Sequence, residues 1–266
     1  ALQFTNFSMQ NLFNKQARRR AFLPQGDGQT LSISGQTNGS YYQSYSINFM
    51  DPWFGGKRPN TLSVTGFFSK QTDISSSYYN SAYYSSMMYG GYGYGGYGNY
   101  GNYGYENFYD PDKSVKLWGI TVGFGKRLRW PDDYFQAYLA LTYQRYELKD
   151  WKYFIISNGN SNNINLNLTI ARNSIDNQIY PRRGSEFSLE ASLTPPWSAF
   201  DGKDYKNLAT NPNSPTYQKE LAQKYKWIEY YKVKFKSKTY TALASGAKAP
   251  VLMTRIDFGY LGAYNK

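Results

Sequence analysis

The residue types that carry out most enzymatic chemistry are missing from this sequence of 266 residues. It has no histidine and no cysteine, which excludes Ser-His nucleophiles, thiol catalysis, disulfides and Cys/His zinc sites. Glu186 and Glu190 share a predicted strand face, but four residues of strand separate them by about 13 Å, beyond the carboxylate spacing of glycosidases. Asp51, Asp110 and Asp112 lack the spacing of a calcium-binding loop. We therefore expect a protein that is not an enzyme and has no cofactor or metal.

The most distinctive charged feature is a row of lysines at alternate positions: Lys232, Lys234, Lys236 and Lys238. Successive side chains of a strand point to opposite faces, so the lysines share one face and Tyr231, Val233 and Phe235 share the other. A lysine near the middle of a bilayer costs about 2–4 kcal/mol, so the row is expected to face a water-filled lumen. There it is either solvated charge, countered by Glu186, Glu190 or Asp257, or a selectivity element for anions.

Alternation of polar and apolar residues predicts the elements that position these charges. It is clearest over residues 163–170 and 186–193, as expected for strands with one wet and one apolar face. Alternation also predicts the strand over residues 231–236 that carries the lysines, and weaker alternation predicts seven further strands, over residues 2–10, 29–40, 41–51, 60–70, 115–128, 134–148 and 251–264. Most are as long as the ~9–11 residues that cross a bilayer at a tilt, whereas strands of soluble proteins are typically ~5–6 residues long.

The connections between the strands also favour a transmembrane barrel. Short turns are predicted at residues 38–40, 52–59, 131–133, 181–184 and 245–247, and long connections at 15–28, 72–114, 149–162 and 198–226. Transmembrane barrels put short turns on one side and long loops on the other. This rule holds from residue 60 onward and is broken by the 15–28 connection, which falls on the short-turn side. Within the last long connection, residues 217–226 are predicted to form a short helix in which Tyr217, Leu221 and Tyr225 share a face.

Aromatic residues strengthen the membrane prediction. All six tryptophans lie at or near a predicted strand end or connecting loop: Trp53, Trp118, Trp130, Trp151, Trp197 and Trp227. This placement is typical of the aromatic girdles at membrane–water interfaces. No apolar run approaches the ~18 residues of a membrane-spanning helix. We therefore predict an all-β fold, a transmembrane antiparallel β-barrel.

The connection over residues 72–114 is a low-complexity segment rich in tyrosine and glycine. It is predicted to be a flexible surface loop, with an aromatic docking surface for partner proteins or a sugar-stacking site as alternatives. Its candidate partner-binding residues are Tyr92, Tyr94, Tyr97, Tyr100 and Tyr103. The net charge of +12 is spread along the chain rather than gathered in a nucleic-acid-binding motif, so no nucleic-acid partner is expected.

Two segments resemble the BamA family of outer-membrane barrel-assembly proteins. Residues 42–54, which end in Asp51-Pro52-Trp53-Phe54, resemble a strand of the family that ends in a polar residue, proline and aromatics. Residues 173–185, with Tyr180-Pro181-Arg182-Arg183-Gly184-Ser185, resemble a family strand–turn–strand that ends in aromatic-Pro-x-x-Gly-Ser. The turn over residues 55–59 and the Tyr/Gly-rich insertion look most like Bacteroidetes versions.

The resemblance implies that the chain is part of a larger barrel. Complete family members have periplasmic POTRA domains followed by sixteen strands, and residues 1–266 resemble about strands 2–11 of these. The POTRA domains, the first strand and the C-terminal strands have no counterpart here, and the family's Val-Arg-Gly-Phe/Tyr motif does not occur. We therefore expect a fragment of a longer chain, with residues 72–114 as an extracellular loop.

The resemblance also implies a function. Family members fold and insert β-barrel proteins into the outer membrane of Gram-negative bacteria, through a lateral gate and local bilayer thinning. The implied partners are nascent outer-membrane barrels, accessory lipoproteins, surface-exposed subunits and outer-membrane lipid or lipopolysaccharide. Arg18, Arg19 and Arg20, on the implied periplasmic side, are either a contact for such partners or an ordinary basic linker. The alternative functions are a passive, anion-preferring porin or transporter and a surface barrel or adhesin.

Overall fold

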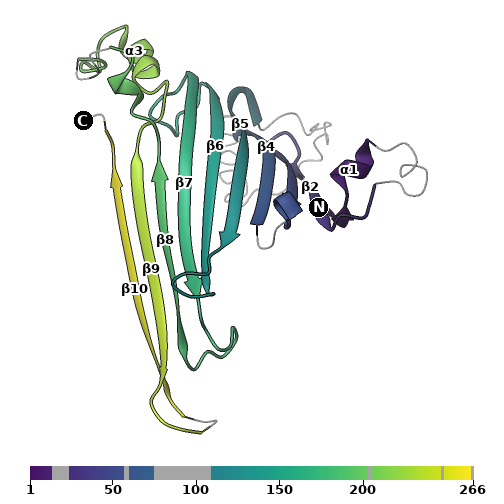
Figure 1. Cartoon of the computed structure of the whole chain (residues 1–266). Coiled ribbons are helices and arrows are strands. Elements are labelled where there is room, and N and C mark those ends of the chain that lie inside the picture. Colours follow the sequence, from purple (N-terminus) through teal and green to yellow (C-terminus); the bar gives the residue numbers. More distant parts are fainter. Residues whose placement is uncertain are drawn as a thin grey trace, which may run out of the picture.

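The fold is a single antiparallel sheet of ten strands in sequence order (Figure 1). The computed structural model describes residues 1–13, 24–56, 60–74, 109–202, 205, 207–246 and 249–264. The strands are β1 (Leu2–Phe7), β2 (Gln29–Asn38), β3 (Tyr42–Asp51), β4 (Asn60–Ile74), β5 (Tyr109–Arg127), β6 (Phe135–Lys149), β7 (Gly159–Asn173), β8 (Gly184–Leu193), β9 (Tyr231–Ala242) and β10 (Val251–Gly262). The predicted all-β, antiparallel fold class is confirmed.

Short helical segments accompany the sheet. They are α1 (Met9–Leu12), α3 (Tyr217–Lys224) and the 3-10 turns η2 (Phe54–Gly56) and η3 (Trp197–Ala199). The predicted short helix in the last long connection is confirmed as α3, with Leu221 buried. None of the helices in the described part of the chain is long and apolar enough to cross a membrane.

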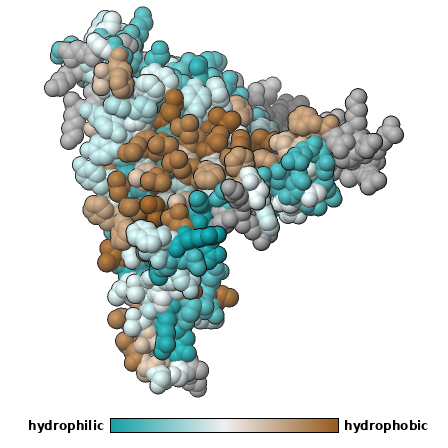
Figure 2. All heavy atoms as spheres, viewed as in Figure 1, coloured by the Kyte–Doolittle hydropathy of each residue, from teal (hydrophilic) through white to brown (hydrophobic). Residues whose placement is uncertain are grey.

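Register divides the sheet into two chemically different faces. One row of paired residues crosses nine strands and contains no charged side chain: Phe4, Leu31, Phe49, Val64, Val122, Leu141, Leu166, Leu193 and Tyr231. Many apolar side chains on this apolar face are exposed, including Ile120, Leu141 and Phe258. Figure 2 shows the apolar side chains gathered in a band across the sheet. A contiguous exposed apolar surface of this kind is typical of a wall that faces lipid.

Strand β5 shows how tall the apolar band is. On the apolar face its residues Trp118, Ile120, Val122 and Phe124 lie between Lys116 and Lys126. Ten residues at about 3.3 Å each, tilted by about 40°, rise about 25 Å, the height of the apolar band of outer-membrane barrels. The charged residues at both ends of the band therefore have the separation expected of residues at the two headgroup levels of a membrane.

The two ends of the sheet differ. The short connections from β3 to β4, β5 to β6, β7 to β8 and β9 to β10 are at one end of the sheet, here named the turn end. The other end carries residues 150–158 and 195–230, including α3, which lies at the top of Figure 1. These two segments fold back over the sheet and are named the cap. The cap contains the cluster of buried residues formed by Leu148, Trp151 and Ile156.

Several predicted boundaries differ from the structure. The first strand ends at Phe7 rather than residue 10, because the Ser8 hydroxyl accepts the amide N–H of Asn11 at 3.1 Å and caps α1. Strands β4 and β5 extend to Ile74 and from Tyr109, into the range predicted as loop. The strand predicted over residues 163–170 runs over Gly159–Asn173. Its first residues, 159–163, are glycine, asparagine and serine, so polar and apolar residues do not alternate there.

The girdle prediction is wrong for Trp151. Its side chain is only 5% exposed and lies in the cap. There it packs on the apolar side chains of Leu148 and Ile156. Trp197 and Trp227 pack on each other with ring centroids 4.5 Å apart. Trp53 and Trp130, in contrast, are exposed at the turn end, as interfacial aromatics are.

Candidate functional site: the polar face and its cap

The face opposite the apolar band, named the polar face, carries the predicted charged residues together. Register places Glu186 opposite Lys238 and Glu190 opposite Lys234 on β8 and β9. Asp257 of β10 lies opposite Lys236. The four lysines of β9 therefore share a face with the three carboxylates that the sequence suggested as counter-charges.

These carboxylates do not neutralise the whole lysine row. Glu186 pairs with Lys238 at 3.7 Å, and Asp257 pairs with Arg255 of its own strand at 2.5 Å. Glu190 instead accepts hydrogen bonds from the Asn167 amide (3.2 Å) and the Ser192 hydroxyl (3.5 Å). Lys232, Lys234 and Lys236 form no ion pair with any described residue.

The middle of the rest of the polar face is uncharged, and charged residues such as Asp73 and Arg127 lie only near the strand ends of its described part. From β1 to β7 one row of paired residues reads Gln3, Ser32, Asn48, Thr65, Thr121, Thr142 and Asn165. These side chains hydrogen-bond across the strands, as between Asn48 and Thr65 at 2.6 Å or Thr121 and Thr142 at 3.0 Å. We call the polar face of β2–β7 the neutral half and that of β8–β10 the charged half.

The neutral half is closed at one end by the cap. Leu148, at the end of β6, packs with Trp151 and Ile156, and Val115, Ala222 and Tyr225 pack around them. Because Leu148 and Val115 are register partners, they lie together on the polar face. Burying side chains of this size contributes about 1.5–3 kcal/mol each, so apolar packing holds the cap against the wall.

Asp73 ties the cap to the wall by polar contacts. Its carboxylate, at the end of β4, is buried, and it accepts a hydrogen bond from the Tyr153 hydroxyl at 3.2 Å. It also pairs with the Lys152 ammonium at 3.3 Å. This carboxylate raises the pKa of Lys152 above its usual value, because it favours the charged ammonium. The contacts join β4 to the β6–β7 loop across β5.

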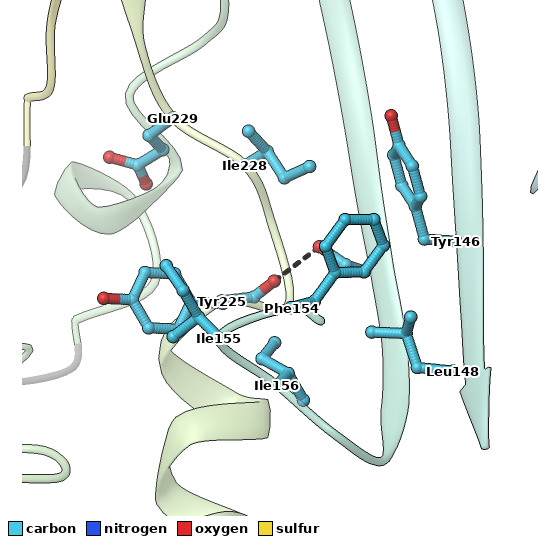
Figure 3. Close-up of a pocket in the computed structure, with 9 residues that line it drawn as sticks. Tyr146, Leu148, Phe154, Ile155, Ile156, Tyr225, Ile228 and Glu229 are labelled. Carbon is cyan, nitrogen blue, oxygen red and sulfur yellow. Dashed lines mark hydrogen bonds between the residues drawn. The ribbon is translucent and has the colours of Figure 1, made fainter. Parts of the chain in front are cut away.

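A cavity of about 400 Å³ lies between the cap and the polar face (Figure 3). Its lining is Tyr146, Leu148, Phe154, Ile155, Ile156, Ser161, Tyr225, Ile228 and Glu229. The Ser161 hydroxyl donates to the Tyr225 carbonyl at 2.7 Å, which fixes the segment after α3 to β7. The Glu229 carboxylate accepts hydrogen bonds from the Ser198 amide and from its hydroxyl. The cavity is therefore mainly apolar, and its one carboxylate already has hydrogen-bond donors.

The turn that resembles a known family motif joins β7 to β8. The Asp176 side chain accepts the amide N–H groups of Arg182 (2.9 Å) and Arg183 (3.2 Å). These hydrogen bonds hold the pKa of Asp176 below its usual value of 3.8. Gly184 has φ +105, and a Cβ there would collide with the Ser174 carbonyl. The glycine of the motif is thus required by the backbone of this turn.

The other motif residues of the sequence lie at the turn end, where Trp53 and Tyr180 are exposed and Pro52 and Pro181 are half-buried. Tyr180 is 80% exposed, and Pro181 lies beside it in the same turn. The Trp53 amide N–H, after Pro52, donates to the Asp51 carboxylate at 2.9 Å, which closes the β3 turn. Arg18, Arg19 and Arg20 lie outside the described residues, as do the five candidate tyrosines Tyr92, Tyr94, Tyr97, Tyr100 and Tyr103.

Sequence reasoning did not find the cap. Residues 151–156, Trp-Lys-Tyr-Phe-Ile-Ile, form a mainly apolar run inside a predicted loop. This run is the feature of the sequence from which the cap could have been predicted. The structure brings it onto β4, β5 and β6. Across the described ranges, no group of acidic side chains is arranged to hold a metal ion.

A known protein family matches this chain in sequence, and a known structure resembles it in fold. The Omp85 superfamily domain matches residues 25–266. The fold is similar to the crystal structure of BamA from Haemophilus ducreyi lacking POTRA domains 1–3, with a TM-score of 0.51 and 16% sequence identity. The similarity covers 91% of this chain and 37% of that one, so the chain spans little more than a third of the length of the crystallised chain. No curated protein matches the sequence.

Proposed function

This chain belongs to the Omp85 superfamily, and from that premise we propose that it is the core insertase of an outer-membrane barrel assembly machinery. Barrels of the superfamily lie in the outer membrane of diderm bacteria or of organelles and are generally assembly or transport proteins. One observation carries the proposal: the superfamily match spans residues 25–266. The BamA-like fold over 91% of the chain supports it.

The mechanism that we propose involves no bond chemistry. The apolar face meets lipid, and the polar face lines the lumen. Strand edges template incoming strands by backbone hydrogen bonds, and a lateral gate with locally thinned bilayer lowers the barrier to insertion. The described part of the chain supplies the rigid wall for this process, since nine strands keep one apolar row in register.

Partners and location at a finer level are part of the same proposal. We assign the chain to a Gram-negative bacterium, with nascent outer-membrane barrels as clients. Accessory lipoproteins, surface-exposed subunits and outer-membrane lipid or lipopolysaccharide are the further proposed partners. The cap end is assigned to the outside of the cell and the turn end to the periplasm. The likeness to Bacteroidetes versions remains a prediction.

A passive, anion-preferring pore is the second candidate function. The observation in its favour is the set of lysines on the polar face, Lys232, Lys234 and Lys236, that pair with no carboxylate in the described part of the chain. The cap counts against it, because Trp151 and Ile156 are packed onto the wall of the proposed lumen. The adhesin alternative rests on residues outside the described ranges, so no structural observation favours it.

The decisive experiment is reconstitution of the full-length protein in liposomes with an unfolded client barrel. We expect client folding about tenfold faster than in liposomes that contain an unrelated porin at equal mass. Bilayer conductance is measured on the same preparation. If the client folds no faster and a large anion-selective conductance falls in the Lys234→Glu/Lys236→Glu variant, the pore is the correct function.

A further inference from the structure

The charged half of the polar face has a repeat that matches an extended polypeptide. Lys232, Lys234 and Lys236 point to the same side from alternate residues of β9. Alternate residues of a strand are about 6.6 Å apart. An extended chain with acidic side chains at alternate positions repeats at the same distance, so each carboxylate can meet one ammonium group.

The neighbouring strand leaves room for such a chain. Gly259 of β10 lies opposite Lys234, and a Cβ added there would meet nothing within 4 Å. Leu261 lies opposite Lys232, is 68% exposed, and offers an apolar contact at one end of the row. The lysine row is thus bordered by a gap over Gly259, with the side chains of Asp257 and Leu261 on either side of the gap.

The carboxylates already present do not fill this position. Glu190 is held by Asn167 and Ser192, and Asp257 is held by Arg255. Among the described residues, Lys238 is the one lysine of the row with a cross-strand ion-pair partner, Glu186. The described charged half carries five cations and three carboxylates, so it attracts an anionic ligand.

We propose that the polar face of β9 and β10 binds an extended polypeptide whose acidic residues alternate with neutral ones. This inference rests on the proposed function, since it names a class of client segment for the insertase. Strands of transmembrane barrels alternate polar and apolar residues, so a strand with an acidic lumen face has the required pattern. Each exposed ion pair contributes little to the free energy of binding. Several ion pairs in register are therefore needed to select an alternating acidic segment over other segments.

The test measures equilibrium binding of labelled nine-residue peptides to the full-length protein in detergent, apart from any insertion assay. One peptide alternates Glu and Thr, and the other has the same composition with the Glu residues in one block. We expect the alternating peptide to bind about tenfold more tightly, with an affinity that falls as salt rises. Equal affinities for the two peptides would overturn the inference.

Protein variants separate this site from general attraction of acids to a basic protein. Lys234→Gln/Lys236→Gln is expected to weaken binding of the alternating peptide about fivefold or more. The matched control, Lys219→Gln/Lys226→Gln, changes the charge equally at the cap and is expected to leave binding unchanged. An equal loss in both variants would contradict the assignment.

A neutral substitution tests the shape of the site. Gly259→Leu fills the gap beside Lys234 and is expected to weaken the alternating peptide while leaving the charge unchanged. No effect of Gly259→Leu would place the peptide elsewhere. Inorganic polyphosphate that competes better than the alternating peptide would assign the row to phosphate ligands instead. If the peptide does not bind but client folding is still accelerated, the insertase proposal stands and this inference fails.

Discussion

The two halves of the polar face differ in whether their side chains have partners within the protein. In the neutral half, hydroxyl and amide side chains hydrogen-bond to a neighbour on the next strand, as Thr121 and Thr142 do at 3.0 Å. In the charged half, Lys232, Lys234 and Lys236 have carboxylates nearby but no ion pair among the described residues. The same backbone geometry thus supports one half with hydrogen bonds between its own side chains and another half with lysines that pair with no described carboxylate.

The difference also appears in how the two halves are covered. The cap packs on the neutral half through Leu148 and Val115, whereas Gly259 in the charged half has open space above it. Side chains that already share a hydrogen bond, as Thr121 and Thr142 do, gain little from a ligand, although the Asn163 and Asn165 side-chain oxygens are buried without a hydrogen-bond partner among the described residues. We therefore expect a ligand to stabilise the protein most when it binds to the charged half.

The largest expected effect is on stability, and it appears when a glycine is substituted in each half of the polar face. Gly123 lies under Tyr138 and Ser63, and a Cβ there would collide with the Tyr138 hydroxyl. Gly123→Val is expected to destabilise the barrel by about 3 kcal/mol through overpacking, and Gly259→Val by less than about 0.5 kcal/mol, as at an open surface site. Urea unfolding in detergent measures both. Similar losses in the two variants would remove the contrast between a covered and an open half.

The cap should depend on the contact that crosses the neutral half. In Asp73→Ala the Lys152 ammonium and the Tyr153 hydroxyl both lose a partner. We expect tryptic cleavage after Lys152 to become about tenfold faster, as for the loss of one or two hydrogen bonds. Binding of the alternating acidic peptide to the charged half should not change.

Asp112→Ala is the matched control for the cap experiment. Its ion pair with Lys149 lies at the same end of the sheet, but both side chains are more than half exposed. An exposed pair of this kind contributes little, so cleavage should stay at the wild-type rate. Equal acceleration in Asp73→Ala and Asp112→Ala would mean that Asp73 does not hold the cap.

The turn between the two halves gives a pH test. The folded pKa of Asp176 lies below its usual value of 3.8, so its contribution is present above pH 3.8 and is lost as the pH falls through the folded pKa. Asp176→Asn is therefore expected to unfold at lower urea than wild type at neutral pH. The gap should close below pH 3.8. A gap that persists at lower pH would mean that the carboxylate charge is not responsible.

Alternation alone was enough to predict the ten strands, since most boundaries lie within a few residues of those observed. It also predicted that Lys232 to Lys238 share a face, because that depends only on the two-residue period. It could not predict that Glu190 would bond Asn167 rather than Lys234, since that choice depends on register and rotamers. The cap was missed because long-range packing, which has no short repeat, places Trp151 on Leu148.

The smallest expected effects compare one cross-strand pair from each half. Thr121 and Thr142 are half-buried and share a hydrogen bond, so a double-mutant cycle to valine should give a coupling of about 1 kcal/mol. Glu186 and Lys238 are 3.7 Å apart with side chains 45% and 41% exposed, and a cycle to glutamine should give about 0.5 kcal/mol or less. Added salt should reduce only the second coupling. A larger coupling for the ion pair would mean that the charged half also stabilises itself, and its lysines would then have less to offer an acidic ligand.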